Sequence, residues 1–84
     1  MSTIPKLLKK IGDEELIDQV STVDFQFVDP EDKDELDLFE EIRRILLSMK
    51  DCDKEADLYK ALKRRAYSLA TQLFFHRLNE HKYI

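Results

Sequence analysis

Hydrophobic residues recur at helical spacing in the first part of this chain. Between residues 4 and 20 an apolar residue follows every three or four positions, at Ile4, Leu7, Leu8, Ile11, Leu16, Ile17 and Val20. This is the period of one face of a helix. Gly12 and Asp13 interrupt the pattern, because glycine suits the end of a helix and aspartate the start of one. The pattern predicts an N-terminal helical segment over residues 1–20, either as one kinked helix or as two short helices.

Two longer amphipathic stretches follow, over residues 30–50 and 54–79. Asp29 as a cap and Pro30 at the first position favour a helix start there, and Asp53 can cap the second helix. The apolar positions of the first stretch are Leu36, Leu38, Phe39, Ile42, Ile45, Leu46 and Met49. Those of the second are Leu58, Tyr59, Leu62, Ala66, Leu69, Ala70, Leu73 and Phe74, with Asn79 as its stop. The short link between them predicts an antiparallel helical hairpin.

Residues 21–29 have a different period. Val23, Phe25 and Phe27 alternate with polar residues, which is typical of extended backbone. A lone strand has no partner elsewhere in the chain. We therefore expect an extended arm, which either covers the open face of the hairpin or pairs with a copy of itself in another protomer.

Length and composition favour an all-α fold in one domain, residues 1–84. A chain of 84 residues has room for one domain with a thin core. The single glycine argues against an all-β fold and excludes glycine-rich phosphate loops. Cys52 is the one cysteine, so neither an internal disulfide nor a cysteine-rich zinc site can add stability. Self-association remains, and we expect a homo-oligomer.

The N-terminus lacks the pattern of a secretory signal, and no apolar run has the length of a membrane span. A free cysteine in such a chain fits a reducing compartment. The sequence therefore predicts a cytoplasmic protein that does not bind membranes.

Charge is unevenly distributed, although the net charge is only −4. Residues 1–12 sum to +3, residues 13–41 to −12 and residues 42–84 to +5. Acids at helix starts and bases toward helix ends suit the helix dipole. The sequence pI of about 5.1 argues against binding to a DNA or RNA duplex.

We do not expect an enzyme. Catalysis by acid, base or nucleophile needs paired groups in contrasting environments, and the many carboxylates of residues 29–41 lie along a solvated helix start. His76 and Glu80 have the spacing of two ligands on one helix face, which is weak support for a metal site. No metal or cofactor is therefore expected.

The arm and the helix that follows it carry the candidate ligand site. Phe25 and Phe27 lie on one side of the arm, where a nucleobase could stack on them. Arg43 and Arg44 on the next helix could pair with phosphate oxygens. Rings and arginines become neighbours if the arm folds back, or if they come from different protomers. The alternative is that both rings simply cover the hairpin.

The order of these residues resembles a phage protein family. Phe25-x-Phe27-x-x-Pro30, then Phe39-Glu40-Glu41-Ile42-Arg43, a polar turn, and Leu58 through Ala66 to Leu69-Ala70 are similar to the small anti-CBASS sponge proteins, over about residues 25–78. That family typically has Tyr-His where this chain has Phe27-Val28, and tends to have Trp at the position of Leu69.

The resemblance implies a compact all-helical hexamer without enzymatic activity. Such a protein sequesters cyclic dinucleotides, such as cyclic GMP-AMP, between protomers and cyclic trinucleotides in separate pockets, which deprives the host's CBASS effectors of their signal. Phe27 matches the stacking aromatic and Arg43 the phosphate-binding cation. His76 or Arg77 could match the cation of the trinucleotide site. A phage protein of this kind would act in the cytoplasm of its host.

A second function class remains open. The chain could be a small acidic helical interaction module, an inhibitor or adaptor. It would dock on a host protein through the acidic residues 29–41 or through exposed apolar residues.

Overall fold

Four helices make up the fold of the described chain in a computed structural model. The structure describes residues 4–21, 23 and 29–81. The helices are α1 (Ile4–Ile11), α2 (Glu14–Val20), α3 (Lys33–Lys50) and α4 (Asp57–His81). The all-α prediction is confirmed, since these described residues form helices and turns and no strand.

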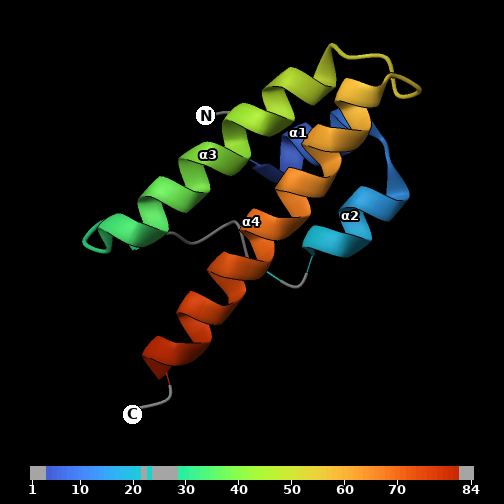
Figure 1. Ribbon diagram of the computed structural model, residues 1–84. Coiled ribbons are helices and arrows are strands. Elements are labelled where there is room, and N and C mark those ends of the chain that lie inside the picture. The colour runs from blue at the N-terminus through green and yellow to red at the C-terminus, as the bar shows by residue number, and fades with distance from the viewer. Residues whose placement is uncertain (1–3, 22, 24–28, 82–84) are drawn as a thin grey trace.

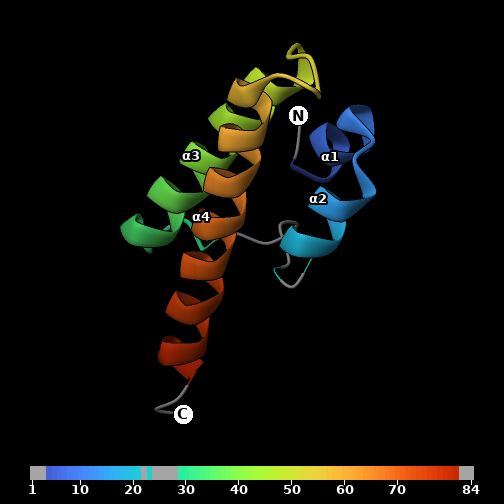
Figure 2. The ribbon, with the colours of Figure 1, turned by 45° about the vertical axis from the view of Figure 1, so that its right-hand side comes forward.

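The long helices α3 and α4 lie side by side, and the short helices α1 and α2 pack against them (Figures 1 and 2). The chain turns back at residues 51–56, so that α4 returns along α3. Helix α1 packs mainly on α3, and α2 packs on α4. The last turns of α4 project beyond the other three helices in both views.

The N-terminal segment consists of two helices rather than one kinked helix. Gly12 ends α1 with φ of +71°, in the left-handed region that glycine adopts readily, and its N–H donates to the Leu8 carbonyl at 3.0 Å. Asp13 then caps α2, because its side chain accepts from the Leu16 N–H at 3.2 Å. Gly12 and Asp13 thus take the helix-ending and helix-capping positions that their residue types favour.

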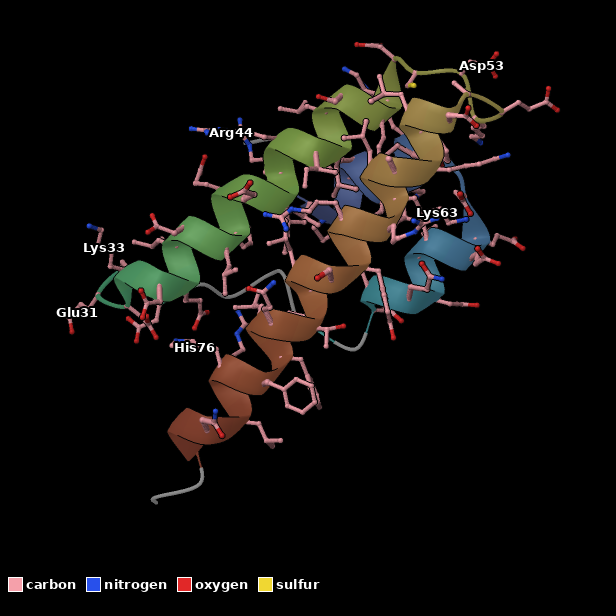
Figure 3. The ribbon with its side chains drawn as sticks, viewed as in Figure 1. Glu31, Lys33, Arg44, Asp53, Lys63 and His76 are labelled. Atoms are coloured by element: carbon pink, nitrogen blue, oxygen red, sulfur yellow. The ribbon has the colours of Figure 1, made fainter. Side chains whose placement is uncertain are left out.

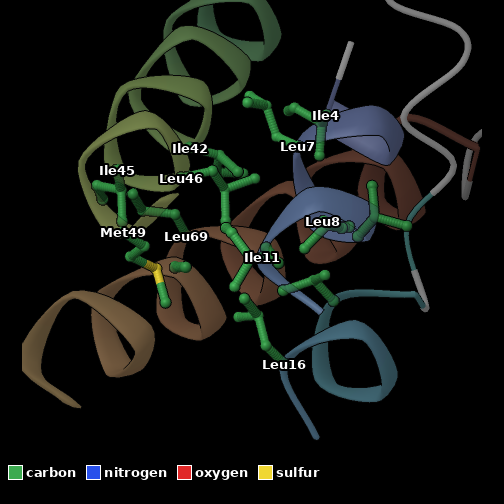
Figure 4. Packing of buried hydrophobic residues seen from close by; sticks show 14 of the residues in the cluster. Ile4, Leu7, Leu8, Ile11, Leu16, Ile42, Ile45, Leu46, Met49 and Leu69 are labelled. Carbon is green, nitrogen blue, oxygen red and sulfur yellow. The ribbon is translucent and has the colours of Figure 1, made fainter. Parts of the chain in front are cut away.

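The core lies where α1, α3 and α4 meet (Figure 4). Ile4, Ile42, Leu46 and Leu73 are fully buried there, with Leu16 of α2 beneath them. Most predicted apolar positions of both long helices are buried or partly buried. Two are not: Leu58 is 62% exposed and Phe74 is 39% exposed. The periodic pattern was wrong at these two positions, because both side chains are exposed to solvent.

The helix starts also differ from the prediction. Helix α3 begins at Lys33 with Asp32 as its cap, whereas the sequence suggested Asp29 and a first turn at Pro30. Asp29 instead closes a turn: its side chain accepts from the Glu31 N–H at 2.9 Å and its carbonyl from the Asp32 N–H at 3.2 Å. Two aspartates that can each cap a helix therefore lie three residues apart. Asp29 closes the turn, and Asp32 caps α3.

Helix α4 begins and ends later than predicted. Asp53 accepts from the Glu55 N–H at 3.0 Å and from the Ala56 N–H at 3.0 Å, which makes a turn before the helix starts at Asp57. The helix continues through Asn79 to His81, because asparagine can end a helix but does not need to.

Only the edges of the predicted arm lie within the described chain. The Val23 N–H donates to the Val20 carbonyl at 3.3 Å, and Val23 is buried. The first apolar residue of the arm therefore packs on the core. Phe25 and Phe27 lie outside the described residues, so the stacking platform stays a prediction.

Candidate functional site

The predicted arginines lie on different faces of the molecule. Arg44 projects from the solvent side of α3, away from α4 (Figure 3). Arg43 is partly exposed, and its Nη1 lies 3.6 Å from Oε2 of Glu40 one turn earlier. Arg77 is on α4, in contact with the start of α3. The structure thus keeps Arg43 and Arg44 adjacent and places Arg77 in a separate cluster.

That cluster joins the start of α3 to the later part of α4. Nε2 of His76 lies 2.6 Å from Oδ2 of Asp32, and the Arg77 guanidinium donates to Oε1 of Glu35 from Nη2 at 2.6 Å and from Nε at 3.1 Å. Glu35 is the one charged side chain in the buried set of described residues, at 5% exposure. A carboxylate so buried needs a partner, and Arg77 provides it. Arg77 therefore has a structural role, whether or not it also meets a ligand.

Asp32 makes two structural contacts in this cluster. Its Oδ1 accepts from the Glu35 N–H at 3.1 Å as the cap of α3, while Oδ2 meets His76. The hydrogen bond with His76, followed by the bond from the Glu35 N–H, holds the pKa of Asp32 below its usual value. The helix start is in this way fixed by a residue on the other long helix.

Asp32, Glu35 and His76 are also ligand types that metal ions use. One ligand atom from each lies within 4.8 Å of the other two. The contacts favour a structural cluster of hydrogen bonds and ion pairs over a metal centre. Arg77 places a positive charge against Glu35, and Asp32 already contacts His76 and caps α3. His76 thus belongs to a cluster that the sequence pairing with Glu80 did not indicate.

A second polar cluster joins the α1–α2 turn to α4. Oδ2 of Asp13 accepts from the Tyr59 hydroxyl at 2.8 Å and lies 3.0 Å from Nζ of Lys63, which also meets Oε1 of Glu15 at 2.8 Å. Figure 3 shows Lys63 between α4 and α2. The sequence carried no signal for this cluster, since Asp13 and Tyr59, for example, are 46 positions apart.

The charges of this second cluster support one another. Burial alone would raise the pKa of Asp13, but the hydrogen bonds from Lys63 and Tyr59 outweigh burial and hold that pKa below its usual value. The hydrogen bond to Glu15 raises the pKa of Lys63. Burial lowers this pKa, but the hydrogen bond to Asp13 raises it further, so that it lies above its usual value. Burial, and then the bond to Asp13, raise the pKa of Tyr59. Asp13 and Lys63 therefore stay charged, and Tyr59 stays neutral, at physiological pH.

This arrangement predicts an acid-sensitive contribution to stability. A carboxylate whose pKa is lowered on folding stabilises the folded state above its unfolded pKa, near 3.8, and loses that contribution as the pH falls through the folded value. Asp13→Asn keeps a residue that caps helices well but removes the charge. In urea unfolding from about pH 6 down to pH 3, we expect the variant to be less stable at the upper end and its deficit to shrink toward the lower end.

Lys63→Met is the matched variant, because it removes the main cation beside Asp13. It should reproduce the smaller pH dependence of Asp13→Asn. If both variants keep the wild-type dependence on pH, the cluster does not contribute as described.

A long hollow lies beside these contacts, between α2 and α4. One part, of about 400 Å³, is lined by Glu15, Gln19, Lys60, Lys63, Arg64 and Tyr67. The other, of about 300 Å³, is lined by Gln19, Tyr67, Thr71, Phe74 and Phe75. Because they share Gln19 and Tyr67, the two parts lie end to end along α4. The hollow brings basic residues of α4 next to its exposed rings.

Comparisons with known proteins add no family assignment. No family model, curated protein or solved structure matches the chain. Within the described residues, no helix is long and apolar enough to cross a membrane. The fold and the clusters thus define a small all-helical protein, and its function rests on the residues themselves.

Proposed function

We propose that this protein is a non-enzymatic binding protein that sequesters cyclic oligonucleotides between its protomers, as the sponge proteins that it resembles do. The observation that carries this proposal is a pair of neighbouring arginines on α3, of which Arg44 is exposed and Arg43 partly exposed. Arg44 has no acidic partner within 4.0 Å among the described residues, and Arg43 has one weak, exposed partner at 3.6 Å. Guanidinium groups without a strong acidic partner can pair with two oxygens of a phosphate.

The rest of the proposed site comes from the arm. Phe25 and Phe27 would stack on the bases, and a phosphodiester ring between them and the arginines would lie at a protomer boundary. Arg77 contributes less to this proposal than the sequence suggested, because Glu35 already neutralises it. The ligand site therefore centres on Phe27 and Arg43, with Phe25 and Arg44 beside them.

Isothermal titration with cyclic GMP-AMP tests this function directly. We expect the wild-type chain to bind, and Arg43→Ala to weaken binding by about 1.5–3 kcal/mol, the range of hydrogen bonds to charged groups. Arg65→Ala is the matched control: this exposed arginine on α4 lies 3.8 Å from Glu41 and should leave affinity unchanged. No heat at high protein concentration would contradict the proposal. Equal affinity of Arg43→Ala and wild type would remove Arg43 from the site.

A second candidate function is supported by a different surface. Tyr67, Phe74, Phe75 and Leu78 are all exposed on α4, and apolar patches of this kind mark interaction sites. They favour the alternative of a small acidic interaction module that docks on a host protein. Light scattering separates the two functions. A stable oligomer in the absence of any partner favours the sponge, and a monomer that shifts only with a protein partner favours the module.

A further inference from the structure

One face of α4 changes character along its length. Tyr67, Thr71, Phe74, Phe75 and Leu78 follow each other at helical spacing and form what we call the α4 stripe. Tyr67 is 47% exposed, Phe75 54% and Leu78 53%. The same face begins with two cations, Lys60 and Arg64, which lie two turns and one turn before Tyr67, respectively.

The two cations lack partners within the described part of the chain. No carboxylate there lies within 4.0 Å of Lys60 or Arg64, whereas Lys63 is taken up by Asp13 and Glu15. Both free cations line the larger hollow between α2 and α4. The hollow therefore offers positive charge at one end and aromatic rings at the other.

We propose that the α4 stripe is a self-association surface, on which the α4 helices of two copies pack antiparallel around Thr71. Shape supports this arrangement. The last turns of α4 project beyond the rest of the molecule (Figures 1 and 2), so the end of one helix can lie in the hollow of another copy. A twofold axis at Thr71 places Phe75 of each copy against Tyr67 of the other, and Leu78 against Arg64, because each member of these pairs is equally distant from residue 71.

Charge selects the antiparallel arrangement. The carbonyl end of a helix carries a partial negative charge. In antiparallel packing, Lys60 and Arg64 of one copy lie beside that end of the other α4. Parallel packing would instead place the four cations together, which is unfavourable.

The exposed area is sufficient for a small interface. An aromatic side chain has about 150–250 Å² of surface, so three half-exposed rings and a leucine offer about 400 Å² per copy. Complete burial of these residues in two copies would remove about 800 Å², close to the lower bound of about 1,000 Å² for a specific interface, and the neighbouring lining of the hollow would add to that area. Contacts between Tyr67 of one copy and Phe75 of the other would stabilise the interface beyond the effect of buried area.

The inference rests on the proposed function only in its need for self-association, and its test uses no nucleotide. Analytical ultracentrifugation of the full chain should give a mass of two chains or a multiple of two. Leu78→Lys and Phe75→Glu should each lower that mass to a single chain or a smaller multiple, because the lysine would face Arg64 of the other copy and the glutamate would face the Tyr67 ring. Leu58→Lys is the matched control, because Leu58 is a similarly exposed leucine of α4 that lies off the stripe, and it should leave the mass unchanged. Circular dichroism confirms that each variant is folded.

Two outcomes overturn the surface: a wild-type monomer at high concentration, or folded stripe variants that keep the wild-type mass. Neither would decide whether a nucleotide binds, which the titration measures separately. If all three variants lose the oligomer equally, the contact is not specific to the stripe, and the proposal is likewise wrong.

The register has its own test by disulfide formation. In a Cys52→Ser background, Thr71→Cys should cross-link two chains readily on oxidation, since the two introduced thiols face each other at the axis. Gln72→Cys is the control, because Gln72 is exposed and points about 100° away around the helix. Cross-linking at residue 72 that equals or exceeds cross-linking at residue 71 would overturn the antiparallel arrangement around Thr71.

Discussion

Leu46→Ala is expected to destabilise the protein by about 2–5 kcal/mol, the usual cost of a large-to-small change in a core. Leu46 is completely buried in α3. It lies with Ile42 and Met49 on the side of α3 that faces α1 and α4 (Figure 4). Alanine would leave a cavity there, and a domain of this size has little stability in reserve. The midpoint of urea unfolding, followed by circular dichroism, measures the change.

Leu58→Ala removes the same atoms from a position that is 62% exposed. It should change the free energy of unfolding by no more than about 0.5 kcal/mol. Equal losses for the two leucines would mean that the core is not centred where α1, α3 and α4 meet.

Glu35→Gln is expected to destabilise by about 2–4 kcal/mol, because it leaves the Arg77 guanidinium without its carboxylate in a largely enclosed place. The side chains of Arg77 and Glu35 are 20% and 7% exposed. Urea unfolding at neutral pH again measures the loss. Glu41→Gln is the control, since its pair with Arg65 is more than half exposed on both sides and exposed pairs contribute little.

A paired substitution separates the cost of a broken pair from the value of the intact one. Glu35→Leu combined with Arg77→Met should recover much of the stability lost in Glu35→Gln, because no isolated charge remains buried. A double variant that is less stable than Glu35→Gln would show that the cluster stabilises the fold by more than mutual neutralisation.

The helices and most of the core could be predicted from local pattern. Ile42, Leu46 and Met49 follow the helical period, and each is buried. Glycine at a left-handed φ and aspartate at a cap act through their own backbone and nearest neighbours, which is why the division between α1 and α2 could be anticipated.

The start of α3 could not be predicted in this way. Asp29 and Asp32 are equally suited to cap a helix, and local chemistry does not choose between them. The choice is tied to His76, which lies 44 positions away and meets Asp32. Contacts of that range depend on how the long helices pack, and a short-range pattern does not contain this information.

The candidate site shows the same division. The exposure of Arg44 and the partial exposure of Arg43 follow from their place between the apolar positions of α3. The pattern does not predict the partner of Arg77, because it places Glu35 on a solvated helix start, whereas Glu35 is buried. The apolar pattern predicts Phe74 on the buried side of α4, whereas it is 39% exposed, and the pattern gives no signal for the exposed Phe75 and Leu78.

The contacts of Asp13 have a consequence for how the molecule opens locally. This one side chain caps α2 and holds both Tyr59 and Lys63 of α4. Detaching α2 from α4 therefore breaks the cap and both contacts in the same event. Helix α2 should then unfold as a single cooperative unit, so that its amide hydrogens exchange with solvent together rather than by gradual fraying from one end.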